Sequence, residues 1–109
     1  MIARIWKGRT LAAQADDYMA YMRSTGVHEL RATEGNRGVY VLRRIDGAEA
    51  EFTFISLWES SEAIRRFTGK NIDQAVYYPE DRAYLLVLDP KVNHYEVLVA
   101  PDVGSGEKH

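Results

Sequence analysis

The stretch VYVLRRIDGAEAEFTFISLWESSEAIRRFTG, residues 39–69, decides the fold class of this 109-residue chain. Two runs rich in branched and aromatic residues, 39–45 and 51–58, flank the pair Asp46-Gly47, a pattern typical of a β-hairpin. Alternation places four residues of the second run on one face: Phe52, Phe54, Ser56 and Trp58. The stretch therefore predicts two antiparallel strands that share one buried face.

A short helix is expected to follow this hairpin. Ser60 has the side chain of a helix N-cap, and Glu62 lies in the positively polarised first turn. Ile64 and Phe67 fall on the inward side of the helix, and Gly69 stands where the helix should end. The order strand, strand, helix is thus predicted for one continuous stretch.

The N-terminal part predicts a strand followed by a helix. Residues 2–7 alternate and contain branched and aromatic side chains, so we expect a strand that Gly8 and Thr10 end. Thr10 is then the expected N-cap of a helix that Gly26 ends. The apolar stripe of this helix has the spacing i, i+4, i+7, i+8 and i+11: Leu11, Ala15, Tyr18, Met19 and Met22.

Two later segments carry weaker signals. Residues 27–37 are polar and rich in turn formers, which predicts a connection with a short ordered piece around 28–30. Asn71 and Gln74 have the spacing of a capping box, which predicts a second helical piece through Val76.

The C-terminal part predicts a turn at 79–82 and two more strands, 84–88 and 92–99. Residues 101–109 carry no packing pattern and are expected to fray. We therefore expect a single domain over residues 1–100 with a flexible C-terminal tail.

The expected order β-α-β-β-α-β, with one more strand, indicates an α+β domain with a ferredoxin-like split βαβ and an antiparallel sheet. Both faces of its strands carry apolar residues, since Phe52 and Phe54 alternate with Ile55 and Leu57. A sheet with one face in water shows a cleaner alternation. We therefore expect helices on one face and a second copy of the chain on the other, which gives a twofold homodimer.

Composition argues against several classes of partner. The 14 basic and 16 acidic residues are mixed along the chain, with no basic block that could follow a nucleic acid. No run approaches the roughly 18 apolar residues of a membrane span, and the charged start MIARIWKGRT lacks a signal-peptide pattern. The chain has no cysteine, which suits a reducing compartment. We expect a cytoplasmic protein without nucleic-acid or membrane partners.

Metal and serine-nucleophile chemistry have no sequence support. The three histidines, His28, His94 and His109, have no metal-binding spacing. Ser60 and Ser61 have no nucleophile-elbow context. We expect neither a metal site nor a catalytic serine.

Three motifs resemble one family. They are the run WESSEAIRRF from Trp58 to Phe67, the segment YYPED from Tyr77 to Asp81, and the run HYEV from His94 to Val97. Together they resemble the antibiotic biosynthesis monooxygenase-like proteins, and the resemblance implies a dimeric α+β barrel. Members of that family include oxygenases that need no metal or flavin and oxidise electron-rich polycyclic aromatic molecules, proteins that bind and degrade haem, and proteins with no known reaction.

The resemblance implies that Trp58 lines a cavity between the helices and the sheet. The alternative is that the ring anchors the core at the sheet edge. With Trp58 inward, Phe54 lies on the same side, while Tyr18, Met22 and Phe67 approach from the helices. The same stripe of Met and aromatic residues is also typical of an ordinary core.

Five further residues complete the candidate site. Arg4 and Trp6 share one face of the first strand, and a buried Arg4 needs an anionic partner from the protein or a ligand, unless its guanidinium reaches water at an edge. His94 could take a phenolic proton if it faces the cavity, or form a structural hydrogen bond. Asp73 and Tyr77, with the adjacent Tyr78, are expected to roof the pocket, where a tyrosine hydroxyl could orient a substrate, or to have structural or solvated roles. The candidate catalytic residues are thus His94, Trp58 and Tyr77.

The chain departs from the family in two places. Haem-degrading members carry an axial histidine in the second helical region, where this chain has Val76 and Tyr77. Oxygenase members place an asparagine near the tryptophan, where this chain has Phe54.

Three hypotheses follow. The first is a monooxygenase that acts on a small aromatic molecule without any cofactor, the second a haem-binding or haem-degrading protein, and the third a non-catalytic small-molecule-binding or assembly module. The first is favoured, because a deprotonated electron-rich phenol can reduce dioxygen itself while the protein binds it and excludes water.

Overall fold

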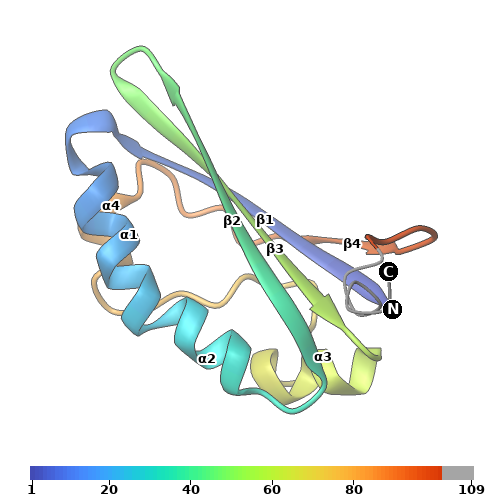
Figure 1. The fold of residues 1–109 in the computed structure, drawn as a ribbon. Coiled ribbons are helices and arrows are strands. Elements are labelled where there is room, and N and C mark those ends of the chain that lie inside the picture. The colour runs from blue at the N-terminus through green and yellow to red at the C-terminus, as the bar shows by residue number, and fades with distance from the viewer. Residues whose placement is uncertain (102–109) are drawn as a thin grey trace.

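A four-stranded antiparallel sheet forms the centre of the protein (Figure 1). The structure is a computed structural model that describes residues 1–101, so residues 102–109 of the expected tail lie outside the described residues. The strands follow the order β2-β3-β1-β4. Their bounds are β1 (Ile2–Leu11), β2 (Asn36–Asp46), β3 (Glu49–Trp58) and β4 (Asn93–Glu96). This is the predicted ferredoxin-like α+β arrangement.

The helices follow β1 and β3. The first group comprises the 3-10 turn η1 (Ala12–Gln14) and the helices α1 (Ala15–Ser24) and α2 (Gly26–Ala32). The second comprises α3 (Ser61–Thr68) and the single-turn helix α4 (Asp81–Tyr84). In Figure 1, α1 and α2 form one bent arc alongside the sheet. None of the helices in residues 1–101 has the length and apolar character of a membrane span.

The predicted hairpin is confirmed. Asp46 pairs with Glu49 across the turn, and Gly47 has a φ of 64°, which glycine adopts without strain. Along β3, every second residue from Ala50 to Trp58 is buried. The alternation of residue types in the sequence therefore correctly indicates which side chains of β3 are buried.

The first strand is longer than predicted. Gly8 and Thr10 do not end it, because both remain paired with β3 up to Leu11. A Cβ on Gly8 would lie 2.2 Å from an atom of the Trp6 ring, so the glycine makes room for the indole and does not form a turn. Thr10 is not a helix N-cap, and its hydroxyl donates to the Leu11 carbonyl at 2.9 Å.

The helical region after β1 is two helices, not one. The first α-helical residue is Ala15, and α1 ends at Ser24. Gly26 begins α2, whereas the sequence predicted that it would end the helix. It is buried, with Tyr78 and Met22 each 3.5 Å from the position of a Cβ. Tertiary packing therefore decides the role of this glycine, and helix α2 replaces most of the connection predicted for residues 27–37.

The helix after the hairpin agrees with prediction. Ser60 accepts a hydrogen bond from the Ala63 N–H at 3.2 Å, and Gly69 ends the helix with a φ of 83°. The second helical piece predicted from Asn71 is wrong. The Asn71 side chain accepts from the Asp73 N–H at 3.0 Å, which makes a local turn in place of a helix.

The segment before β4 also differs from prediction. A single helical turn, α4, overlaps the turn predicted at 79–82, and no strand forms at 84–88. The strand predicted at 92–99 is present only as β4, Asn93–Glu96, paired with β1. It occupies only the Ile2–Ile5 part of that edge, and the chain from 85 to 92 has no regular structure apart from a single bridge between Lys91 and Gln74.

Two buried clusters form the core. One combines α1 with the centre of β3, including Tyr18, Met22, Phe52 and Phe54. The other surrounds Trp58 at the end of β3 and consists of Leu30, Trp58, Ala63 and Ile64. The helices thus cover one face of the sheet with two adjacent packing centres.

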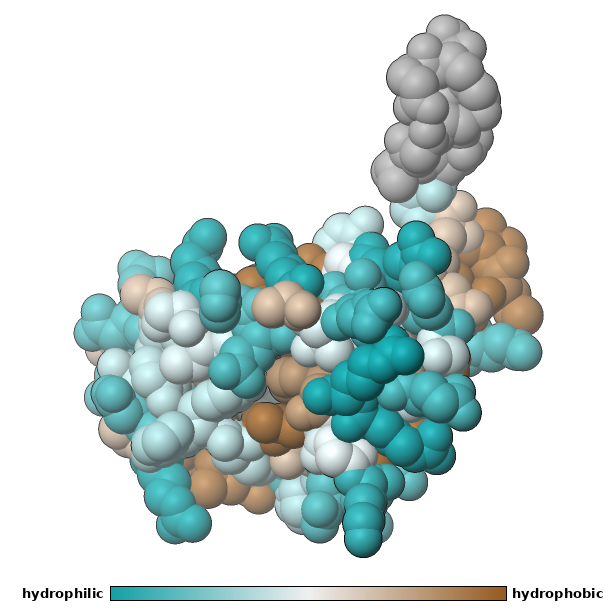
Figure 2. Space-filling view, turned by 90° about the horizontal axis from the view of Figure 1, so that it is seen from below, coloured by the Kyte–Doolittle hydropathy of each residue, from teal (hydrophilic) through white to brown (hydrophobic). Residues whose placement is uncertain are grey.

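The other face of the sheet carries exposed apolar side chains. Tyr40 and Leu42 on β2 are each 51% exposed. Beyond β4, Leu98 and Val99 are 84% and 90% exposed, and Figure 2 shows apolar side chains gathered where the described chain ends. Burial of this face is the reason for the dimer proposed below.

Candidate functional site

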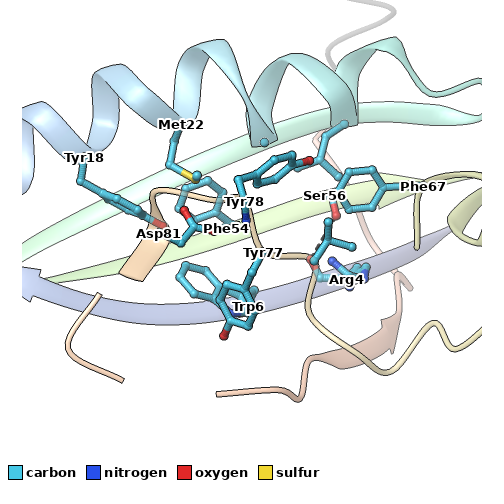
Figure 3. A pocket seen from close by; sticks show the side chains of 13 residues that line it. Arg4, Trp6, Tyr18, Met22, Phe54, Ser56, Phe67, Tyr77, Tyr78 and Asp81 are labelled. Carbon is cyan, nitrogen blue, oxygen red and sulfur yellow. Dashed lines mark hydrogen bonds between the residues drawn. The ribbon is translucent and has the colours of Figure 1, made fainter. Parts of the chain in front are cut away.

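A cavity of about 50 Å³ lies between the two core clusters, under α1 and α2 (Figure 3). Thirteen residues line it: Arg4, Trp6, Tyr18, Met22, Gly26, Leu30, Phe54, Ser56, Phe67, Val76, Tyr77, Tyr78 and Asp81. They come from β1, β3, the helices and the irregular segment after α3. The walls are mainly aromatic and apolar, with charged groups only at Arg4 and Asp81.

Arg4 is a buried cation in this cavity, with 6% of its surface exposed. Its Nη2 donates to the Gln74 carbonyl at 2.7 Å, and the guanidinium carbon lies 5.7 Å from the centre of the Phe67 ring. Its Nε is buried and has no hydrogen-bond partner in the described part of the chain. Burial lowers the pKa of Arg4 to about 10, so it remains charged at neutral pH. Such a group can bind an anionic or carbonyl oxygen.

Asp81 is the second charged group, and it is only 2% exposed. Its Oδ2 accepts a hydrogen bond from the Tyr78 backbone N–H at 2.6 Å. Its Oδ1 is buried without a partner among residues 1–101. Burial raises the pKa of this carboxyl, although the hydrogen bond from Tyr78 lowers it. In Figure 3, Asp81 and Arg4 lie on opposite sides of Tyr77 and Tyr78.

Trp6 and Tyr77 form one wall. The Trp6 indole N–H donates to the Tyr77 hydroxyl at 3.2 Å, and that hydroxyl donates to the Asp89 carbonyl. The Trp6 ring also packs edge-on against Phe54, with 5.4 Å between ring centres. These contacts connect the segment above the cavity to β1.

The tyrosines of the site are neutral at ordinary pH. Burial is the main cause that raises the pKa of Tyr18, Tyr77 and Tyr78, and the charge of Asp81 raises all three further. The Tyr78 hydroxyl also donates to Glu29 on α2 at 3.3 Å. These hydroxyls can donate hydrogen bonds but are poorly suited to act as bases.

Seven of the ten predicted site residues line the cavity. They are Arg4, Trp6, Tyr18, Met22, Phe54, Phe67 and Tyr77. The structure places the other three, Trp58, His94 and Asp73, outside the lining.

Trp58 lies in the second core cluster and is fully buried. Its indole N–H donates to the Ser56 hydroxyl at 2.9 Å, and its ring centre is 6.2 Å from that of Phe67. Both of these neighbours line the cavity. Trp58 thus contacts two lining residues from the core side without lining the cavity itself.

His94 and Asp73 lie together beside Arg4. His94 pairs with Arg4 across β1 and β4, and its Nδ1 is 3.3 Å from Asp73 Oδ1. Burial and then the charge of Arg4 lower the pKa of His94, so it is mainly neutral at pH 7. Within residues 1–101, no group of three or more His, Cys, Asp or Glu side chains could hold a metal ion.

Sequence reasoning did not select Asp81, Gly26, Leu30 or Val76 for the site. Asp81 has a signal, because it belongs to the quoted YYPED segment and precedes the apolar residues 84–88. An acidic residue beside such a run is usually solvated. Only the packing of α1 over α4 shows that this one is buried.

The fold is a ferredoxin-like α+β domain with a largely aromatic cavity between the helices and the sheet. The sequence model of the antibiotic biosynthesis monooxygenase family matches residues 1–73, and the chain belongs to that family. No curated protein matches it closely enough to serve as a relative.

Solved structures share the fold. A candidate antibiotic biosynthesis monooxygenase from Bacillus cereus has 17% sequence identity and a TM-score of 0.59, with 92% of this chain and 97% of that chain covered. The haem-degrader MhuD from Mycobacterium tuberculosis, with two haems bound in its active site, has 17% identity and a TM-score of 0.56, with 93% and 99% covered. At these identities, the likeness concerns the fold alone.

Proposed function

We propose that this protein is a cofactor-independent monooxygenase that oxidises a small electron-rich phenol in the cavity between the helices and the sheet. The observation that carries the proposal is the buried Arg4, which lines a mainly aromatic and apolar cavity and whose Nε–H has no hydrogen-bond partner among residues 1–101. A phenolate, or a carbonyl conjugated to it, would satisfy this donor and lie against the apolar walls.

The reaction needs only dioxygen as co-reactant. A phenol with a free para position loses its hydroxyl proton, and the electron-rich ring then reduces dioxygen. One oxygen atom replaces the para hydrogen as a carbonyl, and the other leaves as water. The substrate supplies all four electrons, so phenol and dioxygen give quinone and water. The protein supplies binding, orientation and a site from which water is excluded.

A polycyclic substrate requires the cavity to open. The enclosed volume of about 50 Å³ is well below the roughly 300 Å³ or more of typical ligand sites. Tyr77 and Tyr78 lie on the irregular segment between α3 and α4, which is the part of the wall without regular secondary structure. We propose that this segment moves outward when substrate enters.

Haem does not fit the residues present. The structure places neither His28, which is exposed on α2, nor His94 in the lining. The Tyr77 hydroxyl is already held by Trp6 and Asp89. Haem binding is therefore the less favoured candidate, and no step is assigned to it.

We also propose a homodimer that buries the open face of the sheet. Tyr40 and Leu42 are half exposed there, beside the partly buried Ile55 of β3, which is Tyr40's strand partner. A second copy would remove this apolar surface from water.

Oxygen uptake with 1-naphthol tests the proposed activity, because one oxygen atom added at its para carbon gives 1,4-naphthoquinone and water. We expect uptake by the purified protein without added metal, flavin or reductant, and a loss of at least tenfold in kcat/KM for Arg4→Met, which keeps the stem and removes the charge. Arg23→Met, on the exposed side of α1, is the matched control. Equal activity of the two variants would contradict the role of Arg4.

A further inference from the structure

We infer that Asp81 accepts the hydroxyl proton of the substrate. We also infer that the substrate carries a second oxygen at the far end of its ring system, away from the free para carbon that is oxidised, and that this oxygen accepts a hydrogen bond from Arg4. The inference rests on the proposed function for its substrate class. It names Asp81 as the proton acceptor in the cavity and fixes the orientation of the ligand, with its hydroxyl towards Asp81 and its second oxygen towards Arg4.

The first step of the argument is the free oxygen of Asp81. One carboxylate oxygen is fixed by the Tyr78 N–H at 2.6 Å, which holds the side chain in place. The other oxygen, Oδ1, is buried and has no partner among the described residues, and Asp81 is one of the residues that line the cavity. A buried charged acceptor without a donor is costly, and a ligand hydroxyl would remove that cost.

The second step is that no neighbouring group provides a competing base. The titratable groups facing Asp81 are Tyr18 from α1 and Tyr77 and Tyr78 from the segment before α4, all held neutral by burial. On α4 itself, Arg82 is exposed, as is the preceding Glu80. Asp81 is therefore the acidic group in the cavity lining that changes charge between acidic and neutral pH, while His94 and Asp73, beside Arg4, lie outside the lining.

The third step is the position of the two polar groups. Arg4 and Asp81 lie on opposite sides of the cavity with the rings of Tyr77 and Tyr78 between them (Figure 3). One end offers an N–H donor and the other a carboxylate acceptor. A matching ligand is an aromatic ring system with a hydroxyl at one end and a carbonyl or anionic oxygen at the other, placed so that the carbon para to the hydroxyl stays free.

The proton transfer itself involves no oxidation. The ligand O–H bond breaks, its electron pair stays on the oxygen, and the proton bonds to Asp81 Oδ1. The resulting phenolate is the electron-rich species that dioxygen then oxidises, as in the proposed function.

Binding of two one-ring probes tests the inference without any turnover. The probes are 4-hydroxyacetophenone and 4-fluoroacetophenone, which share the carbonyl and differ in the hydroxyl. Anaerobic calorimetry should show the hydroxyl probe binding to wild type about tenfold to a hundredfold more tightly. Equal affinities for the two probes would overturn the inference. This comparison uses only the wild-type protein, so it does not depend on whether a variant folds.

Asp81→Asn gives the second arm. Its amide oxygen can still accept from the Tyr78 N–H, so the free atom facing the cavity becomes a donor. We expect the preference for the hydroxyl probe to disappear, while Asp17→Asn, on the exposed side of α1, keeps it. An unchanged preference in Asp81→Asn would overturn the inference.

The pH profile of oxygen uptake separates this inference from the proposed function. In wild type, kcat/KM should rise with pH through the titration of Asp81, and Asp81→Asn should lose this acidic limb. If both proteins take up oxygen with the same acidic limb in the pH profile, Asp81 is not the proton acceptor, while the oxygenase activity is supported. If the protein prefers the hydroxyl probe but takes up no oxygen, Asp81 is supported as a ligand-binding group and the proposed oxygenase activity is contradicted.

Discussion

The Trp58 indole N–H donates to the Ser56 hydroxyl at 2.9 Å, so a residue outside the cavity positions one that lines it. Ser56 in turn donates to the Arg4 carbonyl at 3.4 Å. The ring at the end of β3 is therefore joined through Ser56 to the strand that carries the buried cation.

Trp58 variants should affect stability before binding. Trp58→Ala should lower the free energy of unfolding by about 3 to 5 kcal/mol, because it empties a fully buried site. Trp58→Phe keeps most of the ring and loses the bond to Ser56, so we expect a cost of about 1 to 2 kcal/mol. Urea unfolding measures both values. A large loss of probe affinity in a stable Trp58→Phe variant would instead place the indole in direct control of the cavity.

The homodimer predicts a solution mass of about twice the 12.4 kDa chain. Tyr40→Lys should shift sedimentation towards the monomer, because it brings a charge onto the apolar open face. Ala20→Lys, on the exposed side of α1, adds the same charge away from that face and should remain dimeric. A wild-type protein that sediments as a stable monomer at micromolar concentration would contradict the dimer.

Hemin should not form a tight histidine-ligated complex. Neither His28 nor His94 lines the cavity, so titration should give no sharp Soret shift. A stoichiometric complex that disappears in His94→Ala would show that β4 supplies a ligand, and it would overturn this prediction.

The buried carboxylate should make stability depend on pH. Burial raises the folded pKa of Asp81, above the value of about 3.9 for an unfolded aspartate. The stability that this group contributes is fully present below the unfolded pKa and is lost as the pH rises through the folded pKa. Asp81→Asn should therefore be more stable than wild type at pH 7, and the difference should shrink towards pH 3.

Thermal unfolding of wild type and Asp81→Asn across pH 3 to 7 measures this effect, with Asp17→Asn as control. A variant that is less stable than wild type at pH 7 would show that the carboxylate stabilises the fold. A group whose ionisation reduces stability is typical of a functional site.

The hairpin and α3 were predictable because their signals are local. Asp46-Gly47 specifies a turn by its backbone preferences, and the Ser60 hydroxyl meets an N–H three residues away. Such signals do not depend on distant parts of the chain.

The errors occurred where distant contacts decide the structure. Gly26 has the residue type of a helix end, but contact with Tyr78 places it inside the helical region. The apolar residues 84–88 have strand composition, yet only Leu86 reaches β1, through one hydrogen bond to the Arg9 carbonyl. The burial of Asp81 likewise depends on packing that no local pattern reveals.

The most direct test of the central claim is a turnover of 1-naphthol under ¹⁸O₂ with purified protein, followed by mass spectrometry. We predict that each molecule of 1,4-naphthoquinone carries one labelled oxygen atom, that the other label appears in water, and that no added metal, flavin or reductant is required. A quinone without label, or a reaction that proceeds only after such an addition, would contradict it.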